Sequence, residues 1–170
     1  QDLTEYKRAQ RVMLQQERQF RELLDRAPIP IGIVRGGRVA FANQALVKMN
    51  GLASRAEAVG APLAAWVAPE AREAFVERAR RRLRGEAAEE RYETIGLRPD
   101  GSRFPVVATA SLVQFADGPA VIGFFEDVSE QRRHEERLLQ SEARFRQLFD
   151  QLADSAFIID PGMNIVDVNQ

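Results

Sequence analysis

Cysteine is absent from this chain of 170 residues, and histidine occurs once, as His134. Without cysteine there is no disulfide, no thiolate nucleophile and no sulfur ligand for zinc or an iron–sulfur cluster. Lysine is also scarce, since Lys7 and Lys48 are the only two, and the other basic residues are arginine. No run of about 18 apolar residues occurs, so we expect no membrane-spanning segment within this sequence.

Net charge is nearly zero, because 24 basic residues stand against 25 acidic ones. This balance predicts no general attraction to nucleic acid or to anionic lipid. The arginine-rich stretch 78–84 lies among glutamates and contains no interleaved aromatic residues, which favours a solvated helix face over a nucleic-acid site. A chain without cysteine or a membrane segment favours a cytoplasmic location.

Catalytic patterns are also missing. No Walker-type loop or nucleotide fingerprint occurs, and the adjacent glutamates Glu89/Glu90 and Glu135/Glu136 have no pocket context that would support paired-carboxylate chemistry. The sequence therefore predicts no catalytic residue and no metal site. We expect the chain not to be an enzyme by itself.

The first residues lack glycine and proline up to Pro28. Tyr6, Met13 and Phe20 lie seven residues apart, the spacing of a coiled-coil seam, although polar residues interrupt its other row. We expect one long helix that ends before Pro28, because proline disfavours helical geometry at the preceding residue. Residues 1–19 are predicted to be a linker or coiled-coil helix.

Helical composition returns over residues 129–152, where Leu138 and Phe145 are again seven apart and Leu148 follows on the same side. Residues 129–144 are predicted to form a signalling helix. We expect the chain to be a homodimer through both flanking helices, with contacts made by Tyr6, Met13, Phe20, Leu138, Phe145 and Leu148.

Between these helices the pattern is that of a mixed α+β domain. A hairpin is predicted around Gly36-Gly37, and Asn43 is predicted to cap a short helix that ends at Met49. A longer helix is expected to start at Pro69, with one apolar face. That face comprises Phe75, Val76, Ala79 and Leu83, and three strands are expected to follow at Ala88–Arg98, Phe104–Phe115 and Ala120–Val128.

An internal repeat determines the predicted organisation. The segment 20–25 (FRELLD) returns as 145–150 (FRQLFD), and 39–44 (VAFANQ) matches 165–170 (IVDVNQ). We expect one complete unit followed by the opening of a second, truncated unit, as in a fragment of a tandem array.

This order of elements resembles the PAS domain family. The segment 98–104 (RPDGSRF) is similar to the family's Asp-Gly hairpin, and 123–130 (GFFEDVSE) to its last strand and the Asp-Ile/Val-Thr/Ser motif that follows. The resemblance implies an α+β fold with a five-stranded antiparallel sheet, helices on one face and long helices at both ends. It places the PAS domain at residues 20–128 and the start of a second one at 145–170.

The resemblance also implies a pocket that holds a small ligand or a cofactor. Comparison with the family places Gly96, Val106 and Leu112 inward, and small residues there leave either room for a ligand or space filled by bulky groups such as Phe75. Tyr92 and Thr94 would be the polar groups that contact a ligand. The predicted pocket residues are Tyr92, Thr94, Ala108, Ala110, Val121, Gly123, Phe125 and Trp66.

Known PAS cofactors are disfavoured. Flavin photoreceptors of the light–oxygen–voltage branch need a cysteine, and their flavin-contacting glutamine aligns with Phe125. The axial histidine of the haem sensors falls at or beside Val76, whereas His134 lies beyond the core, so haem and cysteinyl-flavin chemistry are not expected. We expect no cofactor or an unknown small ligand, and a non-covalent flavin near Trp66 stays an alternative.

Family resemblance implies that the signal leaves through Asp127, Val128 and Ser129 at the last strand–helix junction. Asp127 and Ser129 are both candidate caps for the helix that follows. We expect the sensory PAS domain of a multidomain bacterial protein, with a histidine kinase as the favoured output domain further along the same chain. The alternatives are a ligand-free dimerisation or interaction module, and the sensor of a diguanylate cyclase.

Overall fold

The computed structural model describes residues 2–115, 117–151 and 156–168. The chain forms two compact units, residues 1–128 and residues 129–170. The unit boundary follows Val128, the residue before the last long helix. The predicted boundaries after residues 19 and 144 stay predictions.

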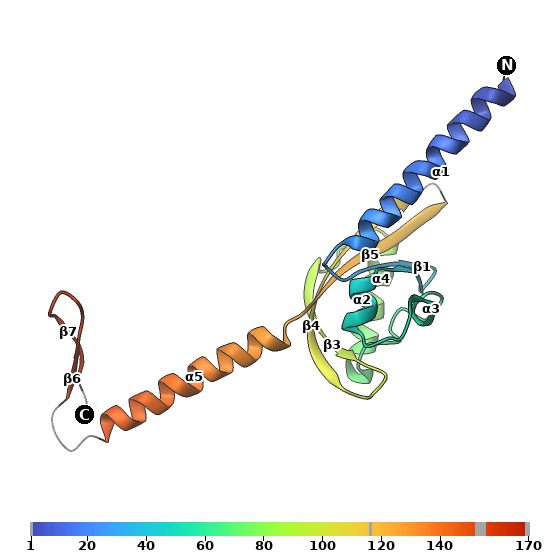
Figure 1. Ribbon diagram of the computed structural model, residues 1–170. Helices are drawn as coiled ribbons and strands as arrows, with labels where there is room; N and C mark the ends of the chain where they lie inside the picture. The colour runs from blue at the N-terminus through green and yellow to red at the C-terminus, as the bar shows by residue number, and fades with distance from the viewer. Residues whose placement is uncertain (1, 116, 152–155, 169–170) are drawn as a thin grey trace. The chain divides into compact units, whose positions relative to one another are not determined.

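The first unit is built on one antiparallel sheet of five strands in the order β2-β1-β5-β4-β3. Helices cover one face of this sheet (Figure 1). The predicted α+β fold with a five-stranded antiparallel sheet is thereby confirmed. The strands are β1 (Ile31–Arg35), β2 (Arg38–Ala42), β3 (Arg91–Leu97), β4 (Arg103–Phe115) and β5 (Gly118–Asp127). The helical segments that follow β2 are α2 (Gln44–Met49), α3 (Arg55–Ala58), the 3-10 turn η1 (Pro69–Ala71) and α4 (Arg72–Leu83).

The N-terminal helix α1 (Asp2–Arg26) ends where the sequence predicts, just before Pro28. Its described side chains are exposed from Thr4 to Leu23, and only Leu24 and Asp25 become partly buried. The predicted dimer residues Tyr6, Met13 and Phe20 are therefore accessible on this helix.

The β1–β2 hairpin forms at the predicted glycine pair. Gly36 and Gly37 both have positive φ, 56° and 74°, a combination that glycine adopts without steric cost. Strand β1 pairs with β2 on one side and with β5 on the other, so it lies inside the sheet. Its residues Ile31 to Val34 are all buried as a result.

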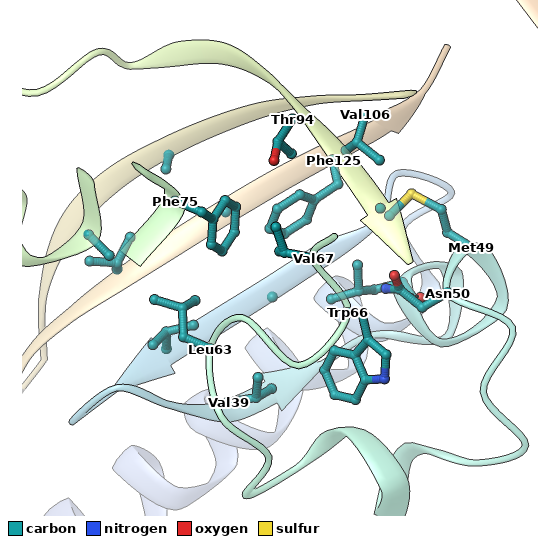
Figure 2. A pocket seen from close by; sticks show the side chains of 18 of the residues that line it. Val39, Met49, Asn50, Leu63, Trp66, Val67, Phe75, Thr94, Val106 and Phe125 are labelled. Carbon is teal, nitrogen blue, oxygen red and sulfur yellow. Dashed lines mark hydrogen bonds between the residues drawn. The ribbon is translucent and has the colours of Figure 1, made fainter. Parts of the chain in front are cut away.

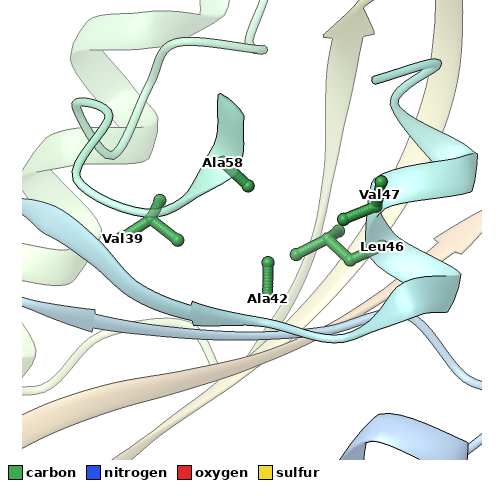
Figure 3. Close-up of a cluster of buried hydrophobic side chains, with 5 residues drawn as sticks. All are labelled: Val39, Ala42, Leu46, Val47 and Ala58. Atoms are coloured by element: carbon green, nitrogen blue, oxygen red, sulfur yellow. The ribbon is translucent and has the colours of Figure 1, made fainter. Parts of the chain in front are cut away.

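Two buried clusters fill the space between the sheet and its helices. The first joins β2 to α2 and α3 and consists of Val39, Ala42, Leu46, Val47 and Ala58 (Figure 3). The second joins α4 to β3 and β4 and consists of Val67, Phe75, Tyr92 and Ala108.

Two residues predicted to face the core are exposed instead. Leu83 is 36% exposed, and its neighbour Arg82 takes the buried position near the end of α4. Leu112 is 46% exposed, because the pairing of β3 with β4 ends at Thr109 and the strand continues beside β5 alone. Both predictions of inward side chains were wrong.

The second unit contains the helix α5 (Ser129–Asp150) and a two-stranded hairpin of β6 (Phe157–Ile159) and β7 (Ile165–Val168). Leu138, Phe145 and Leu148 are exposed on α5, and the ring of Phe145 stacks on that of Phe149 with centroids 6.0 Å apart. Asn169 and Gln170 of the repeat, and Leu152 at the end of the predicted helical stretch 129–152, lie outside the described residues. None of the helices in the described parts of the chain is both long and apolar enough to cross a membrane.

Candidate functional site

A cavity of about 80 Å³ lies in the first unit between the sheet and the helices (Figure 2). All three inner strands β1, β4 and β5 contribute to its wall, together with β3, α4 and the segment before η1. The predicted residues that line it are Trp66, Tyr92, Thr94, Ala110, Val121, Gly123 and Phe125. Ala108 is fully buried among Val67, Phe75 and Tyr92 and is outside the cavity lining.

Gly123 of β5 leaves space at the cavity wall that a larger side chain would need. A Cβ atom at Gly123 would come within 2.8 Å of the Phe125 ring, closer than carbon atoms approach in proteins. The Phe125 side chain thus occupies part of the space that Gly123 leaves open, and Figure 2 shows its ring beside Val67 and Phe75. The two alternatives from the sequence both hold in part: bulky rings fill some of the space, and a cavity remains.

One side of the cavity carries polar groups from β3. Tyr92 and Thr94 are two residues apart on this strand and therefore share one face. The Tyr92 ring packs edge-on against Phe75, with centroids 6.1 Å apart. Burial raises the pKa of the Tyr92 hydroxyl, and the nearby guanidinium groups of Arg82 and Arg78 partly oppose that rise. The Thr94 hydroxyl oxygen is buried and has no hydrogen-bond partner among the described residues.

Arg82 is a charged pocket residue that the sequence prediction missed. Its side chain lines the cavity and is only 7% exposed. The guanidinium carbon lies 5.7 Å from the centre of the Tyr92 ring, and Nη2 donates a hydrogen bond to the Glu89 carbonyl oxygen. The prediction that this arginine stretch is a solvated helix face was wrong at Arg82, because the last turn of α4 turns this residue toward β3.

Asn43 connects the three elements that open the domain. Its side-chain oxygen accepts hydrogen bonds from the backbone N–H groups of Leu46, at 3.0 Å, and Ile31, at 2.9 Å. Its side-chain nitrogen donates to the carbonyl oxygens of Leu24 and Ile29, at 3.0 and 2.8 Å. The predicted cap of α2 is confirmed, and the same fully buried amide also holds the end of α1 and the start of β1.

Arg98 connects the pocket wall to the end of the last strand. Its Nε donates to the carbonyl oxygen of Met49, a cavity-lining residue, at 3.0 Å. Its Nη2 donates to the Asp127 carboxylate at 2.9 Å, and its guanidinium lies over the Phe104 ring. Val128 follows Asp127, is buried, and donates its N–H to the Pro105 carbonyl oxygen. Helix α5 begins at Ser129, which makes Ser129 its first helical residue.

The residues present fit neither of the two best-known PAS cofactors. The sequence contains no cysteine for a flavin adduct, and Phe125 projects into the pocket where the photoreceptors carry glutamine. The first unit contains no histidine, and His134 is an exposed residue of α5. In the parts of the chain that the structure describes, no cluster of three or more His, Cys, Asp or Glu side chains could hold a metal ion.

Comparison with solved structures finds the same fold in several PAS domains. The PAS domain of an HTR-like protein from Haloarcula marismortui is 18% identical with a TM-score of 0.56, over 71% of this chain and 98% of that one. The PAS domain of a two-component sensor histidine kinase is 15% identical with a TM-score of 0.53, over 66% and 97%. A light–oxygen–voltage domain studied with a flavin analogue is 22% identical with a TM-score of 0.52, over 72% and 93%.

Comparison with sequence families gives the same result. No curated protein matches the sequence. A family model of the PAS domain matches residues 28–130, which is more than half of the chain, and a second PAS-domain model matches residues 143–170. The predicted repeat is thereby confirmed as a second PAS match. The chain belongs to the PAS domain family.

Proposed function

We propose that this chain is the sensory and relay part of a bacterial histidine kinase, in which the pocket binds a small ligand and α5 carries the response toward the output domain. PAS domains are sensory and regulatory modules. The kinase output is supported by the fold shared with a PAS domain of a two-component sensor histidine kinase. A cytoplasmic location is part of this proposal.

The contact that carries the proposal is the one made by Arg98. It bonds the carbonyl of Met49 at the pocket wall and the carboxylate of Asp127 at the end of β5. A ligand that moves Met49 would alter this contact, and with it the position of the strand that leads into Ser129. Signal coupling through Asp127, Val128 and Ser129 needs such a link between the pocket and the helix.

Ligand retention can be tested on the full chain without knowing the ligand. We expect native mass spectrometry of the purified protein to show a small molecule bound in addition to the apo mass, with no visible absorption band from haem or flavin. A single apo mass in protein that is folded by circular dichroism would contradict ligand sensing. It would favour the second candidate, a ligand-free dimerisation and interaction module.

A homodimer through the flanking helices belongs to both candidates. Exposed apolar side chains at seven-residue spacing on α1 and α5 support it, because such a row is stabilised by burial against a second helix. We expect Leu138→Glu with Phe145→Glu to shift the dimer toward monomer in sedimentation velocity. Gln140→Glu, an exposed polar position of the same helix, is the matched control. An unchanged sedimentation coefficient for the double variant would contradict this interface.

A further inference from the structure

The pocket wall is largely apolar, and its polar side chains are Arg82, Tyr92, Thr94 and the buried amide of Asn50. We propose that the pocket binds a small carboxylate with a short apolar body, whose charged group is held by Arg82 and Thr94. This inference rests on the proposed ligand-sensing function and names the chemical class of its ligand. It depends on two donor groups and on the size of the cavity.

Arg82 provides a buried positive charge that pairs with no carboxylate among the described residues. Its Nη2 donates to a backbone carbonyl oxygen, and its buried Nη1 has no hydrogen-bond partner within the described parts of the chain. The carboxylate of Glu89, whose backbone oxygen accepts from Arg82, bonds Arg78 instead, with oxygen–nitrogen distances of 3.1 and 3.2 Å. A buried charge without a counter-charge is unfavourable, so an anion bound at Nη1 would be strongly stabilised.

Thr94 provides a second donor on the same side of the cavity. Tyr92, which lies under the Arg82 guanidinium, and Thr94 face the cavity from the same strand, about 7 Å apart along it. Figure 2 shows Thr94 at the edge of the pocket with its hydroxyl turned toward the side where Phe75 and Phe125 lie. Its oxygen is buried and unpaired among the described residues, so it is available to donate to an acceptor in the cavity.

The rest of the wall and the volume define the body of the ligand. Val34, Leu46 and Trp66 are among the apolar residues that line the cavity. One water needs a cavity of about 10–15 Å³, so a cavity of about 80 Å³ has room for a small molecule of several non-hydrogen atoms. A carboxylic acid with a chain of about five carbons has this size.

Isothermal titration calorimetry of the full chain with three probes of one length tests the charge. Pentanoate is the proposed ligand type, and 1-pentanol and pentylamine are its neutral and cationic counterparts. We expect pentanoate to bind about tenfold or more tightly than 1-pentanol, and pentylamine not to bind, because hydrogen bonds to charged groups are stronger than neutral ones.

Variants test the donors. Arg82→Met keeps most of the side-chain length and removes the charge, and we expect it to weaken pentanoate binding about tenfold or more. Thr94→Val removes only the hydroxyl, and we expect a loss of about threefold. Arg80→Met, an exposed arginine of the same helix, is the matched control and should leave pentanoate binding unchanged.

Three results would overturn the inference. The first is 1-pentanol binding as tightly as pentanoate. This result would contradict a preference for an anionic ligand, but it would leave the proposed ligand-sensing function in place. The second is unchanged pentanoate binding in Arg82→Met. The third is no binding of any probe, and a small molecule retained in native mass spectrometry would then show that only the ligand class is wrong. If Arg82→Met does not fold, Thr94→Val and the comparison of the three probes on the unmodified chain still test whether the pocket binds a carboxylate.

Discussion

The two hairpins of this chain come from the same repeat and differ in their surroundings. Strands β1 and β2 form the first, and β6 and β7 form the second. Both carry an irregularity at the same repeat position, between Ile33 and Val34 in one and between Ile158 and Ile159 in the other. Val39 of the first is 6% exposed, whereas its counterpart Ile165 is 62% exposed.

The shared irregularity shows that the local sequence is sufficient to shape the hairpin. The difference in burial arises from what packs against it. In the first unit β5 pairs with β1, and α2 and α3 pack against β2. In the second hairpin β6 and β7 pair only with each other among the described residues. Local pattern therefore forms a hairpin, and tertiary neighbours bury it.

The strongest test of this comparison removes the residue that connects the first hairpin to its surroundings. We expect Asn43→Ala to lower the free energy of unfolding by about 3 kcal/mol or more, because it removes a helix cap and leaves buried backbone groups unpaired. Urea denaturation followed by circular dichroism measures this change.

Ser54→Ala is the control for that variant. Ser54 also stands at a cap position, before α3, but its side chain makes no capping hydrogen bond. We expect a change of less than about 0.5 kcal/mol. Equal losses in Asn43→Ala and Ser54→Ala would show that the buried amide has no special role in holding α1, β1 and α2 together.

The next test compares equivalent positions of the two hairpins. Val39→Ala removes two buried methyl groups, and we expect a loss of about 2 kcal/mol in unfolding free energy. Ile165→Ala removes more carbon atoms but from an exposed position, and we expect a change within about 0.5 kcal/mol. Denaturation midpoints of both variants, measured under identical conditions, test this difference. A larger loss of stability for Ile165→Ala would contradict the conclusion that only the first hairpin is buried.

The smallest effect concerns the ion pair between Asp25 at the end of α1 and Arg55 of α3. The Arg55 guanidinium lowers the pKa of the Asp25 carboxyl. A carboxyl with a lowered pKa in the folded state adds stability above its unfolded pKa, near 3.9, and that stability is lost as the pH falls through the folded value. Both side chains are more than one third exposed, so we expect less than about 1 kcal/mol.

Asp25→Asn tests this small effect. We expect it to be slightly less stable than the unmodified chain at pH 7, with the difference disappearing as the pH falls through the lowered pKa of Asp25. Asp150→Asn is the repeat-matched control, because Asp150 makes no ion pair within the described residues. A difference that persists unchanged at low pH would assign the effect of Asp25→Asn to something other than the ion pair.

Sequence patterns predicted most of the helices, strands and turns of the first unit. Gly36-Gly37, Asn43 and Pro28 each act through backbone conformation or a nearby hydrogen bond, so their effect is visible in a few neighbouring residues. The pocket residues of β3 and β5 followed from strand alternation once the family resemblance showed which face is covered. Leu112 failed because the neighbouring strand ends before it, which no local pattern reveals.

The burial of Arg82 could not be predicted from local sequence. An arginine in a stretch rich in charged residues has the sequence signature of a solvated face, and only its position against Tyr92 and Glu89 makes it a buried pocket residue. The hydrogen bonds from Asn43 to Leu24 and Ile29, and from Arg98 to Met49 and Asp127, likewise join segments far apart in sequence.

By itself, the sequence determined the elements, the repeat and the absence of cysteine-based chemistry, because these depend on residue type and local spacing. Only the tertiary structure decided which hairpin is buried, where the cavity lies and which charged side chain faces it. Burial and pairing depend on contacts between distant segments, and those contacts exist only once the sheet has formed.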